Sequence, residues 1–445
     1  MKFEIKDLGI VKEANLELKD LTIITGKNNS GKTYITETCY AILKDLDKFF
    51  KINILQSHFE TFIKEQSVIF NINDYLEQIN DNIDKIIHSF KKNRLHSTFA
   101  SEQKHFLNTQ LNLKLDKEKD YTLNNFKKIG LLGEYDIDVS NIGDKKIKIE
   151  LNKPLINQQK IKKSKLLNAT NHILTLFLEM NFFPSSKYLC AERSGILQFQ
   201  MDIDGNRSQL INEIQNNEKI YVNEFLDRNT GKFPLVVSDS LDSVREIRNR
   251  GIKEPFSIRK NVKENIEKII GGQFEVIDKK ILFNPNIESD LKLNLSETSS
   301  SVCSLIELNY DLLKTPGTNF LLFIDEPEMN LHPINQREIA RLIVLLINQG
   351  YKIIISTHSD IIIREINTMI LLNNPTKKNI RKEEGYSEFE TLNVKKLNCY
   401  TTEQNNDLTY SLKQIPVSQE EGISVESFDK TIEEINRIQD RLLWE

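Results

Sequence analysis

Three short apolar runs, the first interrupted only by Thr22, each lead into a polar segment, while much of the remaining chain alternates or repeats its apolar positions. The runs lie at residues 21–24, 320–324 and 353–355 and are rich in aliphatic, β-branched side chains. Runs of this length predict strands that are buried on both faces of a parallel sheet. A glycine-containing loop follows the first run, and acidic or hydroxyl residues follow the other two. The sequence therefore predicts a central sheet whose strand ends carry polar side chains.

Alternating patterns predict further strands around this sheet. Residues 2–5 and 14–18 alternate like antiparallel strands that lead into the first buried run. Residues 135–139 and 146–151 flank a turn sequence and predict a hairpin, and a second hairpin is predicted at 274–283.

A long segment without turn signals follows the first loop. From residue 32 to residue 128 the chain has no glycine, and its first proline is Pro154, so long helices are expected. One apolar stripe at helical spacing consists of Leu76, Ile79, Ile83, Ile86, Ile87 and Phe90. We interpret residues 49–130 as an inserted helical arm, which either packs on the rest of the chain or binds a partner.

The loop after the first run has the spacing of a phosphate-binding loop. Residues 26–33 read GKNNSGKT, which matches G-x-x-x-x-G-K-[ST] between a predicted strand and a helix starting at Lys32. Such a loop curls backbone N–H groups around phosphate oxygens, and the helix start adds partial positive charge. Lys32 would reach the β- and γ-phosphates, and the Thr33 hydroxyl would bind Mg²⁺. The predicted nucleotide-binding residues are Gly26, Lys27, Asn28, Asn29, Ser30, Gly31, Lys32 and Thr33.

Carboxylates and a histidine follow the other two runs. Residues 320–333 read FLLFIDEPEMNLHP, and residues 352–359 read KIIISTHS. In enzymes with a phosphate-binding loop, an aspartate at such a strand end holds Mg²⁺, which fits Asp325. The glutamate just beyond it polarises the attacking water, which fits Glu326. His358 would lie beside the γ-phosphate, so Glu326 and His358 are the predicted catalytic residues.

Composition narrows the class of protein without pointing to a ligand. The chain has 445 residues, 39% of them hydrophobic, and a net charge of −4, so it can hold two or three domain-sized units and has no global attraction to nucleic acid. Its four cysteines lie far apart, which argues against zinc sites and disulfides. No apolar run is long enough to span a bilayer, and the N-terminus lacks a signal-peptide pattern. We therefore expect a cytoplasmic protein with no membrane partner.

These motifs together resemble the ABC-type ATPase head, in the branch shared by SMC and RecF proteins and by the OLD-like ATPases of bacterial defence systems. GKNNSGKT, FLLFIDEPEMNLHP and ISTHSD stand in the order of that family's Walker A, Walker B with D-loop, and H-loop. The resemblance covers mainly residues 1–40 and 290–370. It implies an α/β P-loop NTPase fold of the ABC-ATPase head type, a mixed sheet with an inserted helical arm, and ATP and Mg²⁺ as cofactors. Asn29 stands where many relatives carry glycine, and asparagine tolerates left-handed backbone conformations.

The resemblance also implies a signature segment before the second motif. Residues 293–305, LNLSETSSSVCSL, lie in the expected place, with Ser299, Ser300 and Ser301 where the family usually has glycine. Their hydroxyls and a helix start could still bind a γ-phosphate. In that family the signature of one subunit completes the site of another, which implies a head-to-tail dimer or a higher homo-oligomer. A phosphate-sensing loop is expected within residues 185–200, where either Gln198, also a predicted metal ligand, or Arg193 would fill that role.

Two further segments concern partners. A basic segment is interleaved with Glu246 and Glu254, which indicates either a solvated face or a contact with DNA or RNA. Its basic residues are Arg245, Arg248, Arg250, Lys253, Arg259 and Lys260.

Residues 371–445 are too few for the Toprim domain of OLD nucleases. We expect them to form one or two edge strands and a closing helix at 428–443.

Three functional hypotheses follow. The first is an ATP-binding and hydrolysing sensor or scaffold subunit of a bacterial anti-phage system, resembling the ATPases of Septu or PARIS, that controls a separate effector nuclease. The second is a DNA-binding ATPase of DNA repair or maintenance, like RecF or SMC, and the third is a nucleotide-gated assembly module with very low hydrolysis. The predicted units are 1–48 (Walker A), 49–130 (arm), 131–205 (hairpin, helix and phosphate-sensing loop), 206–270 (basic helices), 271–370 (signature to H-loop) and 371–445 (C-terminal strands and helix).

Overall fold

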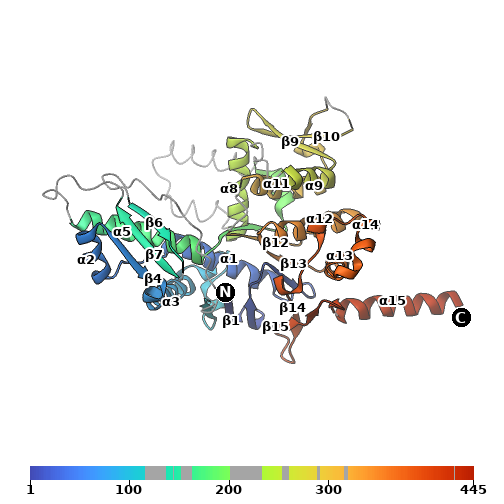
Figure 1. Cartoon of the computed structure of the whole chain (residues 1–445). Coiled ribbons are helices and arrows are strands. Elements are labelled where there is room, and N and C mark those ends of the chain that lie inside the picture. The colour runs from blue at the N-terminus through green and yellow to red at the C-terminus, as the bar shows by residue number, and fades with distance from the viewer. Residues whose placement is uncertain are drawn as a thin grey trace, which may run out of the picture.

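A mixed sheet organises the computed structural model (Figure 1). The structure describes residues 1–115, 137–143, 145–151, 163–200, 233–252, 260–287, 291–314, 319–424 and 426–444. Among these residues, nine strands form the main sheet in the order β5-β1-β2-β15-β14-β3-β13-β12-β8. These strands are β1 (Lys2–Leu8), β2 (Val11–Glu17), β3 (Leu21–Thr25), β5 (Gln110–Lys114), β8 (Ser185–Leu189), β12 (Phe320–Asp325), β13 (Lys352–Ser356), β14 (Leu397–Gln404) and β15 (Tyr410–Ile415).

Smaller sheets and the helices surround the main sheet. One small sheet contains β4 (Ser67–Asn71), β6 (Ile137–Asn141) and β7 (Lys146–Leu151). A second contains β9 (Gly272–Ile277), β10 (Lys280–Pro285) and β11 (Leu293–Asn294). A third consists of β16 (Val417–Ser418) and β17 (Gly422–Ile423). The α-helices are α1 (Lys32–Phe49), α2 (Gln56–Glu65), α3 (Leu76–Asn93), α4 (Leu95–Thr98), α5 (Lys163–Phe182), α8 (Leu235–Arg250), α9 (Lys260–Ile270), α10 (Ser300–Ser304), α11 (Ile306–Lys314), α12 (Pro333–Asn348), α13 (Asp360–Leu371), α14 (Lys378–Glu383) and α15 (Glu426–Trp444). Short 3₁₀ turns are η1 (Ile72–Tyr75), η2 (Gln103–Phe106), η5 (Leu295–Glu297), η6 (Pro375–Lys377), η7 (Glu388–Glu390) and η8 (Val394–Lys396).

The three apolar runs form the parallel centre of the sheet, as predicted. β13 pairs in parallel with both β3 and β12, and every residue of β3 and β12 is buried. Successive side chains of a strand point to opposite faces, so Ile23 packs in one hydrophobic cluster and Ile24 in another. Because the strands run in the same direction, their carboxyl ends meet at one edge of the sheet, and the loop at 26–31 leaves from that edge.

Both predicted hairpins are present. β6 pairs antiparallel with β7, and β9 pairs antiparallel with β10. β1 and β2 also pair antiparallel, as their alternation predicts. The four cysteines are free thiols buried in the core.

The segment 49–130 contains strands as well as helices, so its description as a helical arm is wrong in part. β4 pairs with β7 in a small sheet, and β5 extends the edge of the main sheet beside β1. These strands find partners that are distant in sequence, which local pattern alone does not reveal. Residues 116–130 of the predicted arm lie outside the described residues.

The apolar stripe of α3 packs on the rest of the chain, the first of its two predicted roles. Ile79, Ile83 and Phe90 are each at most 1% exposed and belong to the same hydrophobic cluster as β1. The stripe is therefore part of a core rather than a surface for a partner.

β14 and β15 are not edge strands, which corrects the expectation for residues 371–445 in these two strands. β14 lies between β3 and β15, and β15 pairs with β2, so both strands are inside the main sheet (Figure 1). The sequence of β14 is half polar, which favoured an edge position. Its polar groups are instead satisfied by the fold, since Asn398 Nδ2 donates to Glu17 O at 2.9 Å.

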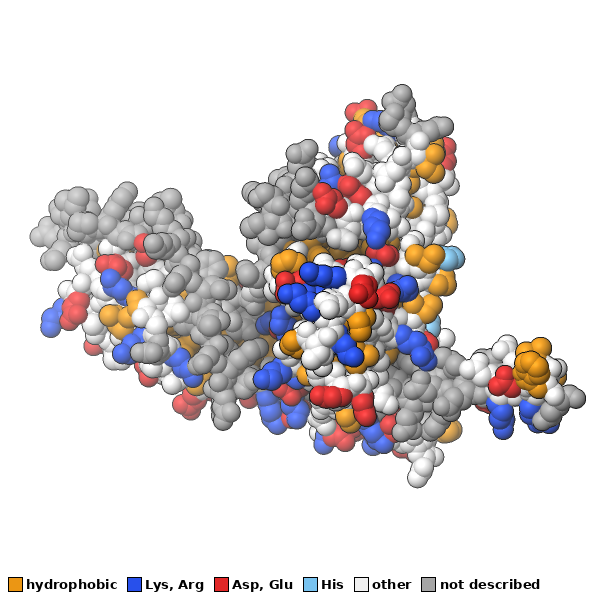
Figure 2. Space-filling view, turned by 45° about the vertical axis from the view of Figure 1, so that its right-hand side comes forward, with side chains coloured by type: hydrophobic (Ala, Val, Ile, Leu, Met, Phe, Trp, Pro, Cys, Tyr) orange, Lys and Arg blue, Asp and Glu red, His pale blue; other side chains and the backbone are white. Residues whose placement is uncertain are grey.

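The final helix is present but does not close the fold. α15 extends away from the body in Figure 1. Leu442 and Trp444 are 80% and 85% exposed, and Figure 2 shows hydrophobic side chains at the free end of this helix. The expected packing of the closing helix is therefore wrong. No helix among the described residues has the length and apolar character needed to cross a membrane.

Candidate functional site

The loop between β3 and α1 has the backbone shape that its glycines predict. Gly26 and Gly31 have φ angles of 139° and 89°, which residues with a side chain rarely adopt. A Cβ atom at Gly26 would collide with Thr402 Oγ1, and one at Gly31 would collide with the Val11 side chain. Asn29 has a φ of 60°, the left-handed conformation expected for it. The loop is thus held between β2 and β14 as it enters α1.

Hydrogen bonds within the loop fix its polar side chains. Ser30 Oγ donates to Lys27 O at 2.6 Å, and Thr402 Oγ1 donates to Ser30 Oγ at 2.6 Å. Ser30 is buried, whereas Lys27, Asn28 and Asn29 are exposed at the loop surface. The exposed backbone of these residues is where phosphate oxygens would approach.

Lys32 is placed to bind phosphate oxygens. Its side chain is 6% exposed, and its Nζ donates to Gly26 O at 3.0 Å and to Lys27 O at 2.9 Å. Burial lowers the pKa of the ammonium group, and the nearby carboxylates of Glu326 and Asp325 oppose this shift. A buried ammonium held only by carbonyls gains a stronger partner when an anion enters the loop.

Three polar side chains meet where Mg²⁺ would bind. Thr33 Oγ1 donates to Asp325 Oδ2 at 3.3 Å, and Ser356 Oγ donates to Asp325 Oδ1. Burial raises the pKa of Asp325, because the charged carboxylate is desolvated. A hydroxyl and a carboxylate are the oxygen ligands that Mg²⁺ prefers, so these residues fit the ion. Thr33 and Asp325 come together as predicted from the sequence.

The predicted catalytic residues lie side by side. His358 Nδ1 is 3.5 Å from Glu326 Oε1 and 3.6 Å from Glu328 Oε1. Glu328 is buried and holds the turn after β13, since its Oε1 accepts hydrogen bonds from Thr357 Oγ1 at 2.8 Å and from the His358 backbone N–H at 2.9 Å. His358 is therefore held in place beside Glu326, at the same end of the parallel strands as Lys32.

The two alternatives for a phosphate-sensing residue occupy different places. Arg193 is 2% exposed and donates hydrogen bonds to four backbone carbonyls, which contradicts a role in reaching a phosphate. Gln198 lines a pocket of about 550 Å³ together with Arg248, Lys280 and Ser296. Its assignment as a metal ligand stays a prediction.

The signature serines lie at the start of a short helix. Ser299 caps α10, where its Oγ accepts from the Val302 N–H at 3.4 Å and lies 2.7 Å from Ser301 Oγ. Ser299 and Ser300 are exposed. Their hydroxyls are thus accessible to a second copy of the chain, and their role there stays a prediction.

Two arginines of the basic segment form ion pairs with acidic neighbours. Arg245 pairs with Asp242 at 2.5 Å, and Arg250 pairs with Glu246 at 2.8 Å. Figure 2 shows basic and acidic side chains interspersed over the face in view. These pairs favour a solvated surface. Residues 253–259 lie outside the described residues, so Lys253 and Arg259 are not placed.

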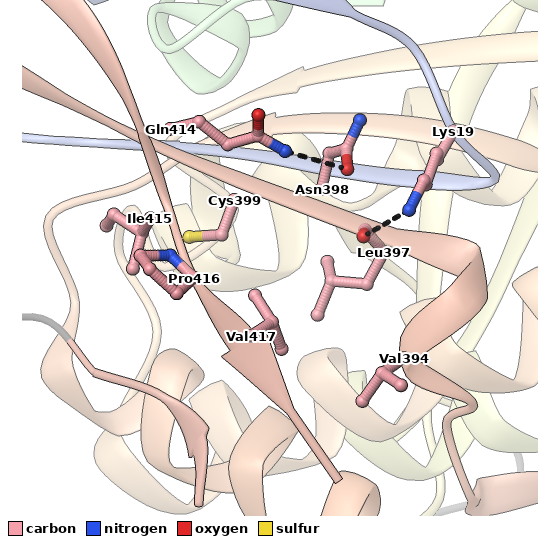
Figure 3. A pocket seen from close by; sticks show the side chains of 9 residues that line it. All are labelled: Lys19, Val394, Leu397, Asn398, Cys399, Gln414, Ile415, Pro416 and Val417. Carbon is pink, nitrogen blue, oxygen red and sulfur yellow. Dashed lines mark hydrogen bonds between the residues drawn. The ribbon is translucent and has the colours of Figure 1, made fainter.

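A separate pocket lies at the start of the parallel strands, at the end of the main sheet opposite the loop (Figure 3). It has a volume of about 360 Å³ and includes Leu397, whose backbone accepts from Lys19 Nζ at 3.3 Å. Leu397 pairs with Leu21 at the start of β3, whereas the loop follows Thr25 at its end. This pocket is therefore distinct from the candidate nucleotide site.

Several residues of the site were not found from the sequence. Ser356 and Glu328 lie within the quoted motifs, and their place at the end of a buried strand or in the following turn could have singled them out. Thr402 comes from β14, and nothing in its own neighbourhood signals the contact with the loop. Glu37 follows the loop by one helical turn and is buried beside Asp325.

We expect the Glu37 carboxyl to make the stability of the fold depend on pH. Burial, together with the charges of Asp325 and Glu192, raises the pKa of Glu37 to about 8. Between the pKa that Glu37 has in the unfolded chain and about pH 8, the unfolded chain has lost this proton while the folded protein keeps it. The free energy of unfolding should therefore fall through this window as pH rises, by at most roughly 1.4 kcal/mol per pH unit.

Glu37→Gln should remove this dependence, because an amide does not titrate. In urea unfolding, the variant should gain stability relative to the parent protein from about pH 5 to about pH 8. Glu77→Gln, at an exposed site on α3, is the matched control and should show a constant difference. A constant difference for Glu37→Gln as well would contradict the assignment.

Comparisons with known proteins show which sequences and structures the chain is similar to. The sequence model of a family described as "AAA ATPase domain" matches residues 1–363. The "Old nuclease" of Escherichia phage P2 is 42% identical over 55 residues, which are 12% of this chain and 9% of that protein. The match therefore spans less than a tenth of this relative.

Solved structures give a more distant likeness. The Smc head domain of Pyrococcus furiosus, described as bound to the C-terminal domain of ScpA, is 13% identical, with 98% of each chain covered and a TM-score of 0.34. The SMC head domain of Thermotoga maritima is 12% identical, with 94% of this chain and 98% of that chain covered and a TM-score of 0.31. A likeness this distant carries no functional weight.

Proposed function

The chain belongs to the AAA ATPase domain family, and from this premise we propose that it binds and hydrolyses ATP between two copies of itself to control a separate partner protein. The observation that carries this proposal is the meeting of Lys32, Thr33, Asp325, Glu326 and His358 at one edge of the sheet. The family match covers all five residues.

Each residue has a part in the proposed reaction. The ammonium of Lys32 shifts from the loop carbonyls to the β- and γ-phosphates, while loop N–H groups hold phosphate oxygens. Thr33 and Asp325 hold Mg²⁺, which when bound neutralises phosphate charge. Glu326 accepts a proton from the attacking water, and His358, 3.5 Å away, orients its carboxylate.

The second copy completes the site in this proposal. Ser299, Ser300 and Ser301 of one chain would donate hydrogen bonds to the γ-phosphate held by the other chain. The exposure of Ser299 and Ser300 at the start of α10 supports such a contact. A head-to-tail dimer would then form when ATP is bound and open after hydrolysis.

We further propose that the controlled partner is an effector nuclease and that the complex acts in bacterial anti-phage defence. The match with the Old nuclease supports a link between this type of ATPase segment and nucleases, over the short span given above. Co-purification with a small nuclease encoded beside the gene is the expected result. A protein that purifies alone from its native host during phage infection would contradict this part of the proposal.

A mixed-dimer experiment tests the shared site. Ser300→Arg should block hydrolysis by crowding the neighbouring γ-phosphate, and Lys32→Ala should block it by preventing binding. In a mixed dimer of these two chains, one site carries both lesions and the other is intact. Hydrolysis should therefore recover to roughly a quarter of the wild-type rate when the chains pair at random.

The controls separate trans completion from other effects. Ser57→Arg, at an exposed serine on α2, should hydrolyse ATP at the wild-type rate. Light scattering should record ATP-dependent dimers in parallel, because strict coupling between the two sites could mask recovery. Normal hydrolysis by Ser300→Arg alone would exclude the proposed role of the serines. Slow hydrolysis by the wild type with intact ATP-dependent dimers would favour the nucleotide-gated assembly module.

A second candidate function is an ATPase that binds DNA. Arg248 and Lys280 line the pocket beside the signature segment, which favours an anionic ligand there. Duplex DNA should then bind more tightly with ATP and lose affinity steeply as salt increases. Absence of binding even at low salt would exclude this candidate.

A further inference from the structure

Arg193 joins three segments of the candidate site from within the core. Its side chain is 2% exposed. Nη1 donates to Cys190 O at 3.0 Å and to Asp325 O at 2.9 Å, Nη2 donates to Glu326 O at 3.0 Å, and Nε donates to Ser304 O at 2.9 Å. The guanidinium therefore connects the ends of β8, β12 and α10.

The backbone that Arg193 holds at Glu326 is in an unusual conformation. Glu326 has a φ of 48°, a left-handed value that residues with a side chain rarely adopt. Its N–H donates to Ser356 O at 2.9 Å, so the peptide groups on both sides of its Cα are fixed. This backbone conformation sets the direction of the Glu326 side chain toward His358, 3.5 Å away.

Arg193 is also tied to the signature segment. α10 has five residues, Ser300–Ser304, and Arg193 binds the carbonyl of the last one. The carbonyl lies about one helical turn from Ser300. The end of α10 thus anchors the guanidinium that holds Glu326, whereas the start of the helix at Ser300 is capped by Ser299.

We propose that Arg193 is a positioning residue that holds Glu326 in the orientation required for proton transfer, with the end of α10 as its anchor. The inference rests on the proposed function, since it assigns Glu326 as the proton acceptor. The planar guanidinium is needed because its N–H groups diverge toward four carbonyls in fixed directions. An ammonium group carries the same charge but cannot satisfy all four carbonyls in this arrangement.

Arg193→Lys tests this inference without removing the buried charge. We expect kcat for ATP hydrolysis to fall roughly a hundredfold, as for a displaced catalytic group, while the Kd for ATP changes little. ATP-dependent dimers should still form. A parallel loss of ATP affinity and dimer formation would show a general structural role and overturn the inference, as would unchanged kcat.

Mixed dimers show which site depends on Arg193. In the pair Lys32→Ala with Ser300→Arg, the surviving site uses Glu326 of the Ser300→Arg chain and the signature of the Lys32→Ala chain. Adding Arg193→Lys to the Ser300→Arg chain should abolish the recovered hydrolysis. Adding it to the Lys32→Ala chain should preserve it. Equal loss in both arms, or loss in neither, would overturn the inference.

The two proposals fail in different ways. If the parent mixture shows neither recovered hydrolysis nor ATP-dependent dimers while Arg193→Lys lowers kcat alone, the shared site is wrong and the positioning role stands. If the parent mixture recovers but Arg193→Lys has no effect on kcat, the positioning role is wrong and the shared site stands.

Discussion

Lys32→Ala is expected to abolish nucleotide binding. The side chain is buried behind the loop, and its Nζ lies within 3.0 Å of two loop carbonyls, where phosphate oxygens would replace them. Hydrogen bonds to charged groups contribute roughly 1.5–3 kcal/mol each, so loss of two such bonds should weaken ATP binding by roughly a thousandfold. Isothermal titration with ATP and Mg²⁺ measures this change directly.

Lys27→Ala is the matched control for this experiment. Lys27 belongs to the same loop, but its side chain is exposed, and the loop uses its backbone carbonyl. Its replacement should leave the Kd for ATP nearly unchanged. Wild-type affinity in Lys32→Ala, or an equal loss in both variants, would contradict the assignment of Lys32.

The parts of the site that follow directly from short motifs were predicted well. Gly26, Gly31 and Asn29 have the positive φ angles that the loop requires. Thr33 and Asp325 are distant in sequence yet form a hydrogen bond, because Asp325 ends β12 and Thr33 follows β3 in the parallel centre of the same sheet. The predicted fold class, an α/β P-loop ATPase with a mixed sheet, is confirmed by the family match and the strand order.

Features that depend on remote pairing were not predicted. β14 contains Asn398, Thr401 and Thr402, so its sequence favours an exposed strand, yet it pairs with β3 in the middle of the sheet. The cost of burying Asn398 is offset because its amide donates to a backbone carbonyl. The same pairing brings Thr402 against the loop, a contact between residues more than 370 positions apart in sequence.

The role of Arg193 shows another limit of motif reasoning. An arginine just after a strand, near a predicted nucleotide site, was interpreted as one of two candidates for phosphate sensing. Burial reverses this interpretation, since its guanidinium donors are directed to backbone carbonyls of the core. Residue type and sequence position did not distinguish a side chain that binds a ligand from one that holds the backbone of the site.

Glu326→Gln should retain ATP binding and lose turnover. The amide has nearly the same shape and can hold water through a hydrogen bond, but it cannot accept the proton of that water. Loss of a general base typically lowers the rate by roughly 10²–10⁴-fold, whereas the Kd for ATP should change little because Lys32 and the loop are intact. Steady-state phosphate release and isothermal titration measure the two effects separately.

The variant should also accumulate dimers with ATP bound, since opening of the proposed dimer depends on hydrolysis. Glu192→Gln provides a control with the same chemical change at an exposed carboxylate whose charge acts on Asp325. It should hydrolyse ATP at close to the wild-type rate and should not accumulate dimers. If Glu326→Gln releases phosphate as fast as the wild type, Glu326 does not accept the proton. If both variants lose activity equally, the negative charge around Asp325, rather than proton transfer at Glu326, supports the reaction.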